Sequence, residues 1–151
     1  MIPQISQAPG VVQLVLNFLQ VLEQQGFTGD TATSYADRLT MATDNSVYQL
    51  LPDAILFPRS TADVALLARL AAEERFKSLI FTPRGGGTGT NGQALNAGII
   101  VDMSRYMNRI IEINPEEGWV RVEAGVIKDQ LNQFLKPYGY FFAPELSTSN
   151  R

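Results

Sequence analysis

The chain has 151 residues, which is the length of one domain, and 45% of them are hydrophobic, as in ordinary globular proteins. Lys and Arg number 12 and Asp and Glu 15, so the net charge is −3 and a nucleic-acid partner is not expected. There is no Cys and no His. Without Cys and His, this chain cannot form disulfides, thiolate nucleophiles, Ser-His-Asp triads or ordinary zinc sites. The absence of Cys fits a reducing, cytoplasmic environment.

The N-terminus predicts neither a secretory signal nor a membrane span. A secretory signal begins with a basic region, whereas the first basic residue here is Arg38. The longest apolar stretch, from Val11 to Leu22, is too short to cross a bilayer and contains Gln13, Asn17 and Gln20.

The N-terminal third is predicted to be helical. Polar side chains at spacings of four, three and four residues form one polar face of a helix from Pro9 to Gln25. A shorter helix is predicted from Thr31 to Thr40, with Asp30 as its N-cap. The polar stretch from Asp44 to Ser46 is interpreted as a turn.

A strand–helix–strand unit follows. Ala54–Phe57 is an apolar run between two prolines and predicts a buried strand. Ser60 and Asp63 resemble a capping box that opens a helix from Thr61 to Phe76. Leu79–Thr82 predicts a second strand, and a helical crossover of this kind makes the two strands parallel.

The second half predicts mixed or antiparallel strands, so the fold class is α+β. Ile99–Asp102 is expected to be a strand, and Ile110–Ile113 with Trp119–Glu123 an antiparallel hairpin with a five-residue loop. A helix is predicted from Val126 to Lys136. Tyr140–Phe142 is expected to be a short strand or extended segment. The rings of Tyr138 and of this segment are expected to contact the core and a further subdomain, and the alternative is that one of them lines a bound cofactor.

A glycine-rich loop separates the second and third strands. Residues 84–92 hold five glycines in nine positions, and glycine allows positive φ and a close approach of a ligand to the backbone. Successive N–H groups in such a turn form a concave site for an anion, and Arg84 adds positive potential. The loop is therefore interpreted as a binding site for a nucleotide pyrophosphate, and the alternative interpretation is a wide surface turn.

Three better-known phosphate loops do not fit. Gly87–Gly92 spells G-x-G-x-x-G, but a Rossmann fingerprint needs a helix there, and residues 93–98 leave no room for one before the next strand. A nucleotide-hydrolase loop needs Lys and Ser or Thr where this chain has Gln93 and Ala94. A kinase loop needs a Lys on the following strand, yet the next Lys is Lys128.

Several motifs occur together in a specific order. They are Pro52–Val64, Thr82–Gly92, Gly98–Asp102, Trp119–Gly125 and Pro144–Thr148. The combination resembles the FAD-binding domain of FAD-linked oxidases, the vanillyl-alcohol oxidase and p-cresol methylhydroxylase superfamily. The resemblance divides the chain into an N-terminal helical extension, 1–49, and the first part of a p-cresol methylhydroxylase-type FAD-binding domain, 50–151. The whole chain is similar to the start of the large bacterial D-2-hydroxyglutarate dehydrogenases.

The resemblance implies roles for individual residues. The loop 84–92 would hold the FAD pyrophosphate through its N–H groups, Gln93 would reach the ribityl chain, and Pro144, Ser147 and Thr148 would approach the flavin. The implied cofactor-binding residues are Arg84, Gly85, Gly86, Gly87, Thr88, Gly89, Thr90, Asn91, Gly92, Gln93, Pro144, Ser147 and Thr148. The FAD is expected to be non-covalent, because Thr88 stands where covalent relatives commonly carry a His or Cys tether.

The resemblance also implies a longer parent enzyme. A second glycine-bearing loop, the substrate-binding residues and the cysteines of a 4Fe-4S cluster would lie beyond Arg151. The chain is therefore expected to be an N-terminal piece that, on its own, binds FAD poorly and lacks dehydrogenase activity.

The expected function is the oxidation of a 2-hydroxy acid by FAD, with D-2-hydroxyglutarate as the leading substrate. The alternatives are a glycolate-type or lactate-type FAD-linked oxidase and a non-catalytic nucleotide-binding module. No paired carboxylates stand at a spacing suited to acid–base work, so no catalytic residue and no metal ligand are assigned. The oligomeric state is left open, with a homo-oligomer as one option.

Overall fold

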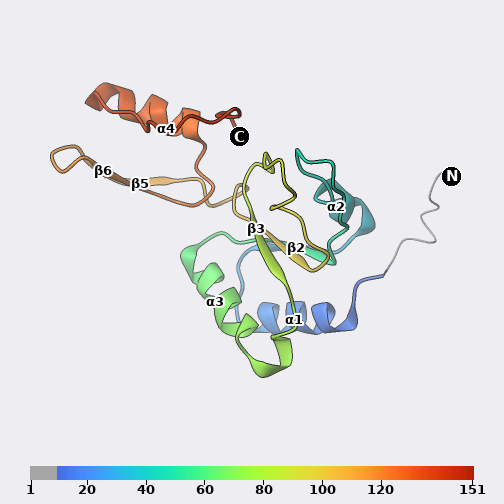
Figure 1. The fold of residues 1–151 in the computed structure, drawn as a ribbon. Coiled ribbons are helices and arrows are strands. Elements are labelled where there is room, and N and C mark those ends of the chain that lie inside the picture. Colours follow the sequence, from blue (N-terminus) through green and yellow to red (C-terminus); the bar gives the residue numbers. More distant parts are fainter. Residues whose placement is uncertain (1–9) are drawn as a thin grey trace.

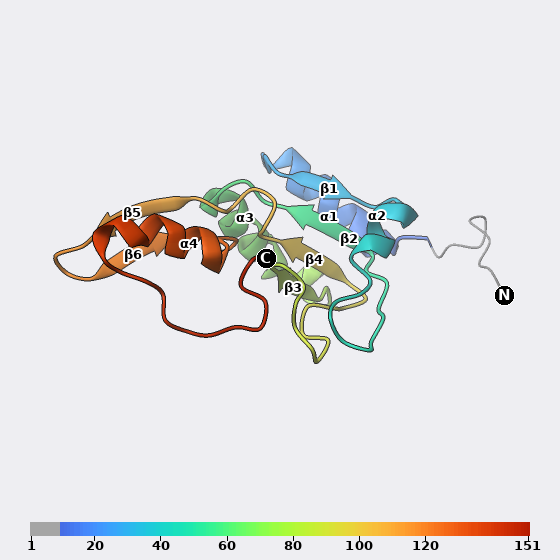
Figure 2. The same ribbon diagram turned by 90° about the horizontal axis from the view of Figure 1, so that it is seen from above.

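The computed structural model describes residues 10–151 and divides them into two parts (Figure 1). The larger part is a four-stranded mixed sheet with helices beside it, and the smaller part is a two-stranded hairpin with one α-helix. The hairpin and its helix extend to one side of the sheet (Figure 2). The predicted α+β class is confirmed.

The main sheet has the strand order β1-β2-β4-β3. The strands are β1 (Asp30–Ala32), β2 (Ala54–Phe57), β4 (Ile99–Asp102) and β3 (Phe81–Arg84). β2, β4 and β3 run parallel, and β1 pairs with β2 antiparallel at the edge. The parallel relation of β2 and β3 was predicted, but the insertion of β4 between them was not.

Two helices and a 3-10 turn pack on one face of this sheet. They are α1 (Gln13–Gln24), α3 (Thr61–Ala71) and η2 (Glu74–Phe76). The Phe18 ring meets the rings of Phe76 and Phe81 at centroid distances of 5.1 Å, and Leu22 and Leu70 are fully buried beside them. This apolar contact makes the main core, while the polar face predicted for α1 is exposed.

The opposite face of the sheet carries a smaller apolar cluster. Ile55, Phe57 and Ile100 are buried there, with Met41 and Tyr106 among the partly buried residues packed against them. The short helix α2 (Tyr35–Thr40) and the segment after it lie beside this face. The face is therefore covered by loops and one short helix rather than by a helical layer.

Asp63 joins the start of α3 to the segment that follows α1. Its buried carboxylate accepts hydrogen bonds from the N–H of Thr28 at 2.8 Å, the hydroxyl of Thr28 at 2.9 Å and the N–H of Arg59 at 2.9 Å. Ser60 caps the helix by accepting from the Asp63 N–H at 3.2 Å, as the capping-box pattern predicted. One carboxylate thus fixes the N-terminal segment against the sheet domain.

The hairpin consists of β5 (Ile110–Asn114) and β6 (Trp119–Val122), followed by α4 (Lys128–Leu135) and η3 (Lys136–Tyr138). Asn114 pairs with Trp119, so the loop has four residues rather than the predicted five. At the hairpin base the buried Glu123 carboxylate accepts from the Arg109 backbone N–H at 2.9 Å and from its guanidinium at 2.7 Å.

Some expected boundaries differ from the structure. α1 begins at Gln13, and its predicted start at Pro9 lies outside the described residues. The helix predicted from Thr31 is wrong in its first half, because Asp30–Ala32 pairs with β2 and Ser34, not Asp30, caps α2. The strand predicted over Leu79–Thr82 begins and ends two residues later.

The segment after η3 forms no strand. Tyr140, Phe141 and Phe142 are extended but exposed, and Phe141 is 70% accessible. Their rings therefore lie outside the core formed by residues 10–151, and their contact with a further subdomain stays a prediction. Across the described range, 10–151, no helix has the length and apolar character needed to cross a membrane.

Candidate functional site

The glycine loop leaves the carboxyl end of β3 at Arg84 and returns to the sheet at β4. Ligands of parallel sheets bind beyond the carboxyl ends of the strands, so the loop lies where a ligand is expected. Residues 93–98 contain turns and no helix, which confirms the argument against a Rossmann fingerprint.

The backbone of the loop presents a run of free donors. Within residues 10–151, none of the N–H groups from Gly85 to Thr90 donates to a protein acceptor. The next N–H, that of Asn91, donates to the side-chain oxygen of Gln93 at 3.0 Å. The loop therefore offers a set of neutral donors of the kind that holds an anion.

The glycines serve two different purposes. A Cβ on Gly85 would meet no atom within 4 Å, so this position opens onto free space. A Cβ on the other four would meet side chains or, at Gly86, Arg151 itself, and Gly87 and Gly92 also have positive φ, +64° and +74°. The first condition suits the close approach of a ligand, and the second means that these positions have no room for a side chain beside their neighbours.

Arg84 is largely buried and donates to backbone carbonyls rather than pointing freely into solvent. Its Nη2 donates to the carbonyl oxygen of Thr43 at 2.8 Å, and its Nη1 lies 3.5 Å from the carbonyl oxygen of Met41. Its own carbonyl accepts from the N–H of Met103 at 2.8 Å. The start of the glycine loop is thus tied both to the residue after β4 and to the segment after α2.

The segment after α2 forms a closed loop of residues 42–50, hereafter the 42–50 loop. It is closed by a hydrogen bond from the Leu50 N–H to the Ala42 carbonyl at 3.0 Å and by an antiparallel bridge between Thr43 and Gln49. The N–H of Asn45 donates to the carbonyl of Gly87 at 3.1 Å. Figure 1 shows the two loops side by side above the sheet.

Asp44 lies inside this contact. The pKa of Asp44 is lowered chiefly by a hydrogen bond from the Ser46 side chain, while burial alone would raise it. The N–H groups of Ser46 and Ala94 and the charge of Arg84 lower this pKa further. The Asp44 carboxylate accepts from the Ser46 N–H at 2.8 Å, which makes the polar turn expected for this stretch. Asp44 is therefore ionised at neutral pH and faces the positive charge of Arg84.

The two loops and the end of the chain enclose a polar depression of about 420 Å³. Its lining residues are Thr40, Thr43, Asp44, Asn45, Arg84, Gly86, Gly87, Thr88, Thr148 and Arg151. The structure places Thr148 at this depression beside the glycine loop, whereas Pro144 and Ser147 do not line it. Sequence reasoning missed the contribution of Thr43 and Asn45, because no local pattern links them to a loop forty residues away.

The tail that carries Thr148 is held along α4. The carbonyl of Ser149 accepts from the Asp129 N–H at 3.1 Å, and the N–H of Phe142 donates to the Asn132 side chain at 2.7 Å.

Gln93, the residue expected to reach the ribityl chain, is turned back onto the glycine loop and packs against Gly89.

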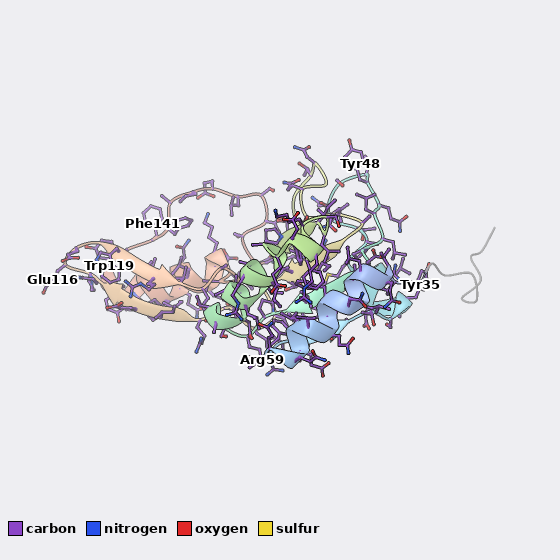
Figure 3. All side chains as sticks on the ribbon, turned by 90° about the horizontal axis from the view of Figure 1, so that it is seen from below. Tyr35, Tyr48, Arg59, Glu116, Trp119 and Phe141 are labelled. Atoms are coloured by element: carbon purple, nitrogen blue, oxygen red, sulfur yellow. The ribbon has the colours of Figure 1, made fainter. Side chains whose placement is uncertain are left out.

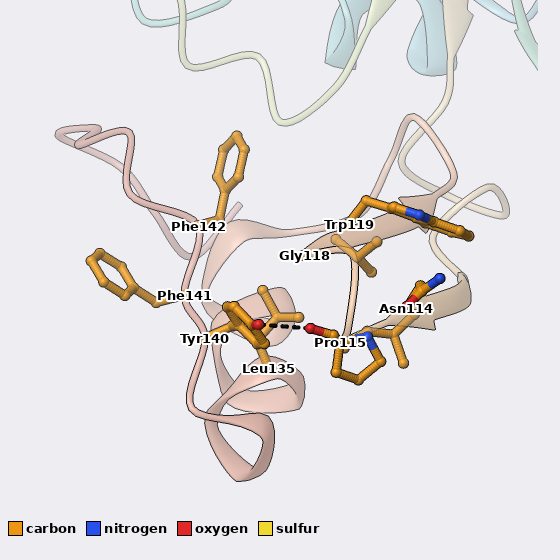
Figure 4. Close-up of a pocket in the computed structure, with 10 residues that line it drawn as sticks. Asn114, Pro115, Gly118, Trp119, Leu135, Tyr140, Phe141 and Phe142 are labelled. Carbon is orange, nitrogen blue, oxygen red and sulfur yellow. Dashed lines mark hydrogen bonds between the residues drawn. The ribbon is translucent and has the colours of Figure 1, made fainter.

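A second, apolar pocket lies between the hairpin and the aromatic tail (Figure 4). It is closed at one side by the hydrogen bond from the Tyr140 hydroxyl to the Pro115 carbonyl at 2.7 Å. Its volume is about 120 Å³, whereas cofactor sites occupy roughly 300–1,000 Å³. It is therefore too small to accept a flavin as it stands.

The chemistry of the glycine loop fits a nucleotide cofactor. The N–H groups of Gly85–Thr90, the open space at Gly85 and the polar depression supply neutral donors. The Asp44 carboxylate in the same lining is close enough to Arg84 for the arginine charge to lower its pKa. In the part of the chain that the structure describes, no cluster of three acidic residues could hold a metal ion.

Comparison with known proteins identifies the family. The FAD binding domain family matches residues 52–151. The chain is 91% identical over all its 151 residues to the D-2-hydroxyglutarate dehydrogenase of Escherichia coli (strain K12) and 79% identical to that of Pantoea ananatis (strain AJ13355). It spans 15% of the length of each of these two relatives.

A solved structure agrees on the fold. An alkyldihydroxyacetonephosphate synthase matches with a TM-score of 0.72 at 21% identity, covering 91% of this chain and 28% of that protein. The FAD binding domain match over residues 52–151 includes the glycine loop, the hairpin and every strand of the main sheet except β1. The chain therefore belongs to the family of FAD-binding domains of the vanillyl-alcohol oxidase and p-cresol methylhydroxylase type.

Proposed function

We propose that residues 1–151 are the N-terminal FAD-binding part of a larger dehydrogenase that oxidises a 2-hydroxy acid, with D-2-hydroxyglutarate as its substrate. The observation that carries this proposal is the 91% identity to the Escherichia coli D-2-hydroxyglutarate dehydrogenase, which extends through the N-terminal extension as well as the FAD-binding region. If this protein had a different substrate from that relative, the sequence differences responsible would lie outside residues 1–151.

We propose the following roles for the residues of this chain. The N–H groups of Gly85–Thr90 hold the FAD pyrophosphate, because an anion satisfies donors that the protein leaves free. Thr148 borders the same depression and is proposed to approach the flavin. The same role is proposed for Pro144 and Ser147, and Gln93 is proposed to reach the ribityl chain. When bound, FAD accepts the hydride of the substrate. No residue of this chain is proposed to be catalytic.

The surface near the hairpin supports a larger parent protein. Ile111, Phe141 and Leu146 are each more than half exposed, and Trp119 lies in the same region at the far end from Tyr48 (Figure 3). A two-stranded hairpin is at best marginally stable alone. We therefore propose that later segments of the polypeptide cover this surface. We further propose that those segments carry the substrate-binding residues and any 4Fe-4S cluster, and that the enzyme is cytoplasmic.

The proposed substrate is tested by mixing the full-length protein with D-2-hydroxyglutarate without oxygen. Bleaching of the flavin absorbance by this compound, but not by its L enantiomer, D-lactate or glycolate, is the expected result. Bleaching by lactate or glycolate instead would favour the alternative oxidase classes. A protein that binds no flavin would contradict the enzyme proposal and favour a nucleotide-binding module.

We also predict that the FAD is not covalently attached through residues 1–151. Covalent flavins of this family are tethered to His or Cys, and the chain contains neither. Acid precipitation of the full-length protein should therefore release its flavin into the supernatant. Yellow colour that remains with a peptide from residues 1–151 after proteolysis would contradict this prediction.

A further inference from the structure

We infer that the 42–50 loop is a working part of the FAD site, although it precedes the matched region of residues 52–151. Acting through Arg84, it holds the glycine loop in the conformation that presents its N–H groups to the pyrophosphate. Arg84 is accordingly a positioning residue and not a charged ligand of the phosphates. This inference rests on the proposed role of the glycine loop.

The first argument is where the donors of Arg84 point. Its guanidinium donates to the carbonyl of Thr43 and lies near that of Met41, and the side chain is only 9% exposed. A Cβ on Gly87 would collide with the same guanidinium, so the group lies directly against the backbone of the loop. Its geometry is that of a link between two backbone segments.

The second argument is that the 42–50 loop contacts the glycine loop along its length. Arg84 is bound at the beginning, the Asn45 N–H donates to the carbonyl of Gly87 in the middle, and the Tyr48 ring packs against Gly92 at the end. The contacts are therefore distributed rather than confined to one point.

The third argument is that the glycine loop lacks restraints of its own. Glycine loses more conformational freedom on ordering than any other residue, and the N–H groups of Gly85–Thr90 make no internal hydrogen bonds within residues 10–151. Restraints from outside the loop reduce the entropy that must be lost when the cofactor binds. The 42–50 loop supplies such restraints.

Arg84→Lys and Arg84→Gln in the full-length protein separate the two roles. Lysine keeps the positive charge but cannot reproduce the two-pronged guanidinium that spans two carbonyls. We expect both variants to bind FAD at least tenfold more weakly than wild type, with a loss that changes little with ionic strength. Arg75→Lys and Arg75→Gln are the matched controls, because Arg75 is exposed and contacts only its neighbours Glu73, by an ion pair, and Phe76, by stacking over the ring.

The affinity for riboflavin distinguishes a specific loss of pyrophosphate binding from general damage to the fold. It carries the flavin ring but no pyrophosphate, so its affinity should be the same for wild type and the Arg84 variants. Retention of FAD affinity by Arg84→Lys, with a strong salt dependence, would identify Arg84 as a charged ligand and overturn the inference. Equal affinities of the wild-type protein for FAD and riboflavin would instead overturn the proposed role of the glycine loop.

Tyr48→Ala tests the same inference without touching a buried residue, since the Tyr48 side chain is 58% exposed. We expect a several-fold loss of FAD affinity with unchanged riboflavin affinity and unchanged thermal stability. If Tyr48→Ala binds FAD with the affinity of the wild type, the 42–50 loop does not restrain the end of the glycine loop, and the inference is wrong for that contact.

Discussion

Replacing Gly87 with alanine is expected to weaken FAD binding by about ten- to a hundredfold while the protein stays folded. Gly87 has a φ of +64°, where an L residue with a Cβ costs roughly 1–2 kcal/mol, and each 1.4 kcal/mol is a factor of ten in affinity. The new Cβ would also displace the Arg84 guanidinium from its position beneath the loop. Titration of the apoprotein with FAD measures the effect.

Gly118→Ala is the matched control for backbone strain. Gly118 has a φ of +72° in the hairpin loop, and a Cβ there would meet no atom within 4 Å. It should lower stability by a similar amount and leave FAD affinity unchanged. Equal loss of FAD affinity in the two variants would mean that strain anywhere in the chain, and not the geometry of this loop, governs binding.

Asp63→Asn is expected to lower the free energy of unfolding by about 1.5–3 kcal/mol, the range for hydrogen bonds to a charged group. The Asp63 carboxylate accepts from two backbone N–H groups and a hydroxyl, and it is 3% exposed. Whichever way the amide of asparagine is turned, its NH₂ group faces a backbone N–H of Thr28 or Arg59. Urea unfolding of both proteins measures the difference.

Asp37→Asn is the control, because Asp37 occupies the same place relative to its cap, Ser34, at the start of α2 but is exposed. Its replacement should change stability by less than about 0.5 kcal/mol, as for most surface substitutions. A similar loss in both variants would show that helix capping, and not the buried link to Thr28, carries the effect.

The effect of Asp63 should also depend on pH. Burial alone would raise the pKa of Asp63, but the hydrogen bonds from Thr28 and from the N–H of Arg59 outweigh it and lower the pKa. A lowered carboxyl pKa contributes stability that is present above the unfolded-state pKa of about 3.9 and is lost as the pH falls through the folded-state value. The stability gap between wild type and Asp63→Asn should therefore be constant near neutral pH and narrow in acid.

The Arg84 contacts change how the glycine motif is interpreted. In the sequence the arginine stands directly before three glycines and suggests a cation for the phosphates. In the structure its hydrogen bonds go to carbonyl groups of a segment forty residues earlier. In the proposed site the anion is therefore bound by the backbone N–H groups of the loop, whose conformation we infer to be held by the 42–50 loop.

Local patterns in the sequence determined the elements whose causes are local. The apolar run of β2, the cap at Ser60 and the hairpin were predicted because strand burial, capping and short turns depend on residues that are close in the chain. The order of the glycine loop and its flanking motifs likewise identified the family, since a phosphate-binding loop is a continuous segment.

Only the tertiary structure decided the features that depend on distant pairing. Asp30–Ala32 became an edge strand because β2 offered it unpaired backbone groups, and β4 entered between β2 and β3. The same applies to the proposed FAD site, where the 42–50 loop and Thr148 meet residues 84–92. Backbone carbonyls and N–H groups carry no side-chain signature, so a hydrogen bond such as that from Arg84 to Thr43 leaves no pattern in the sequence.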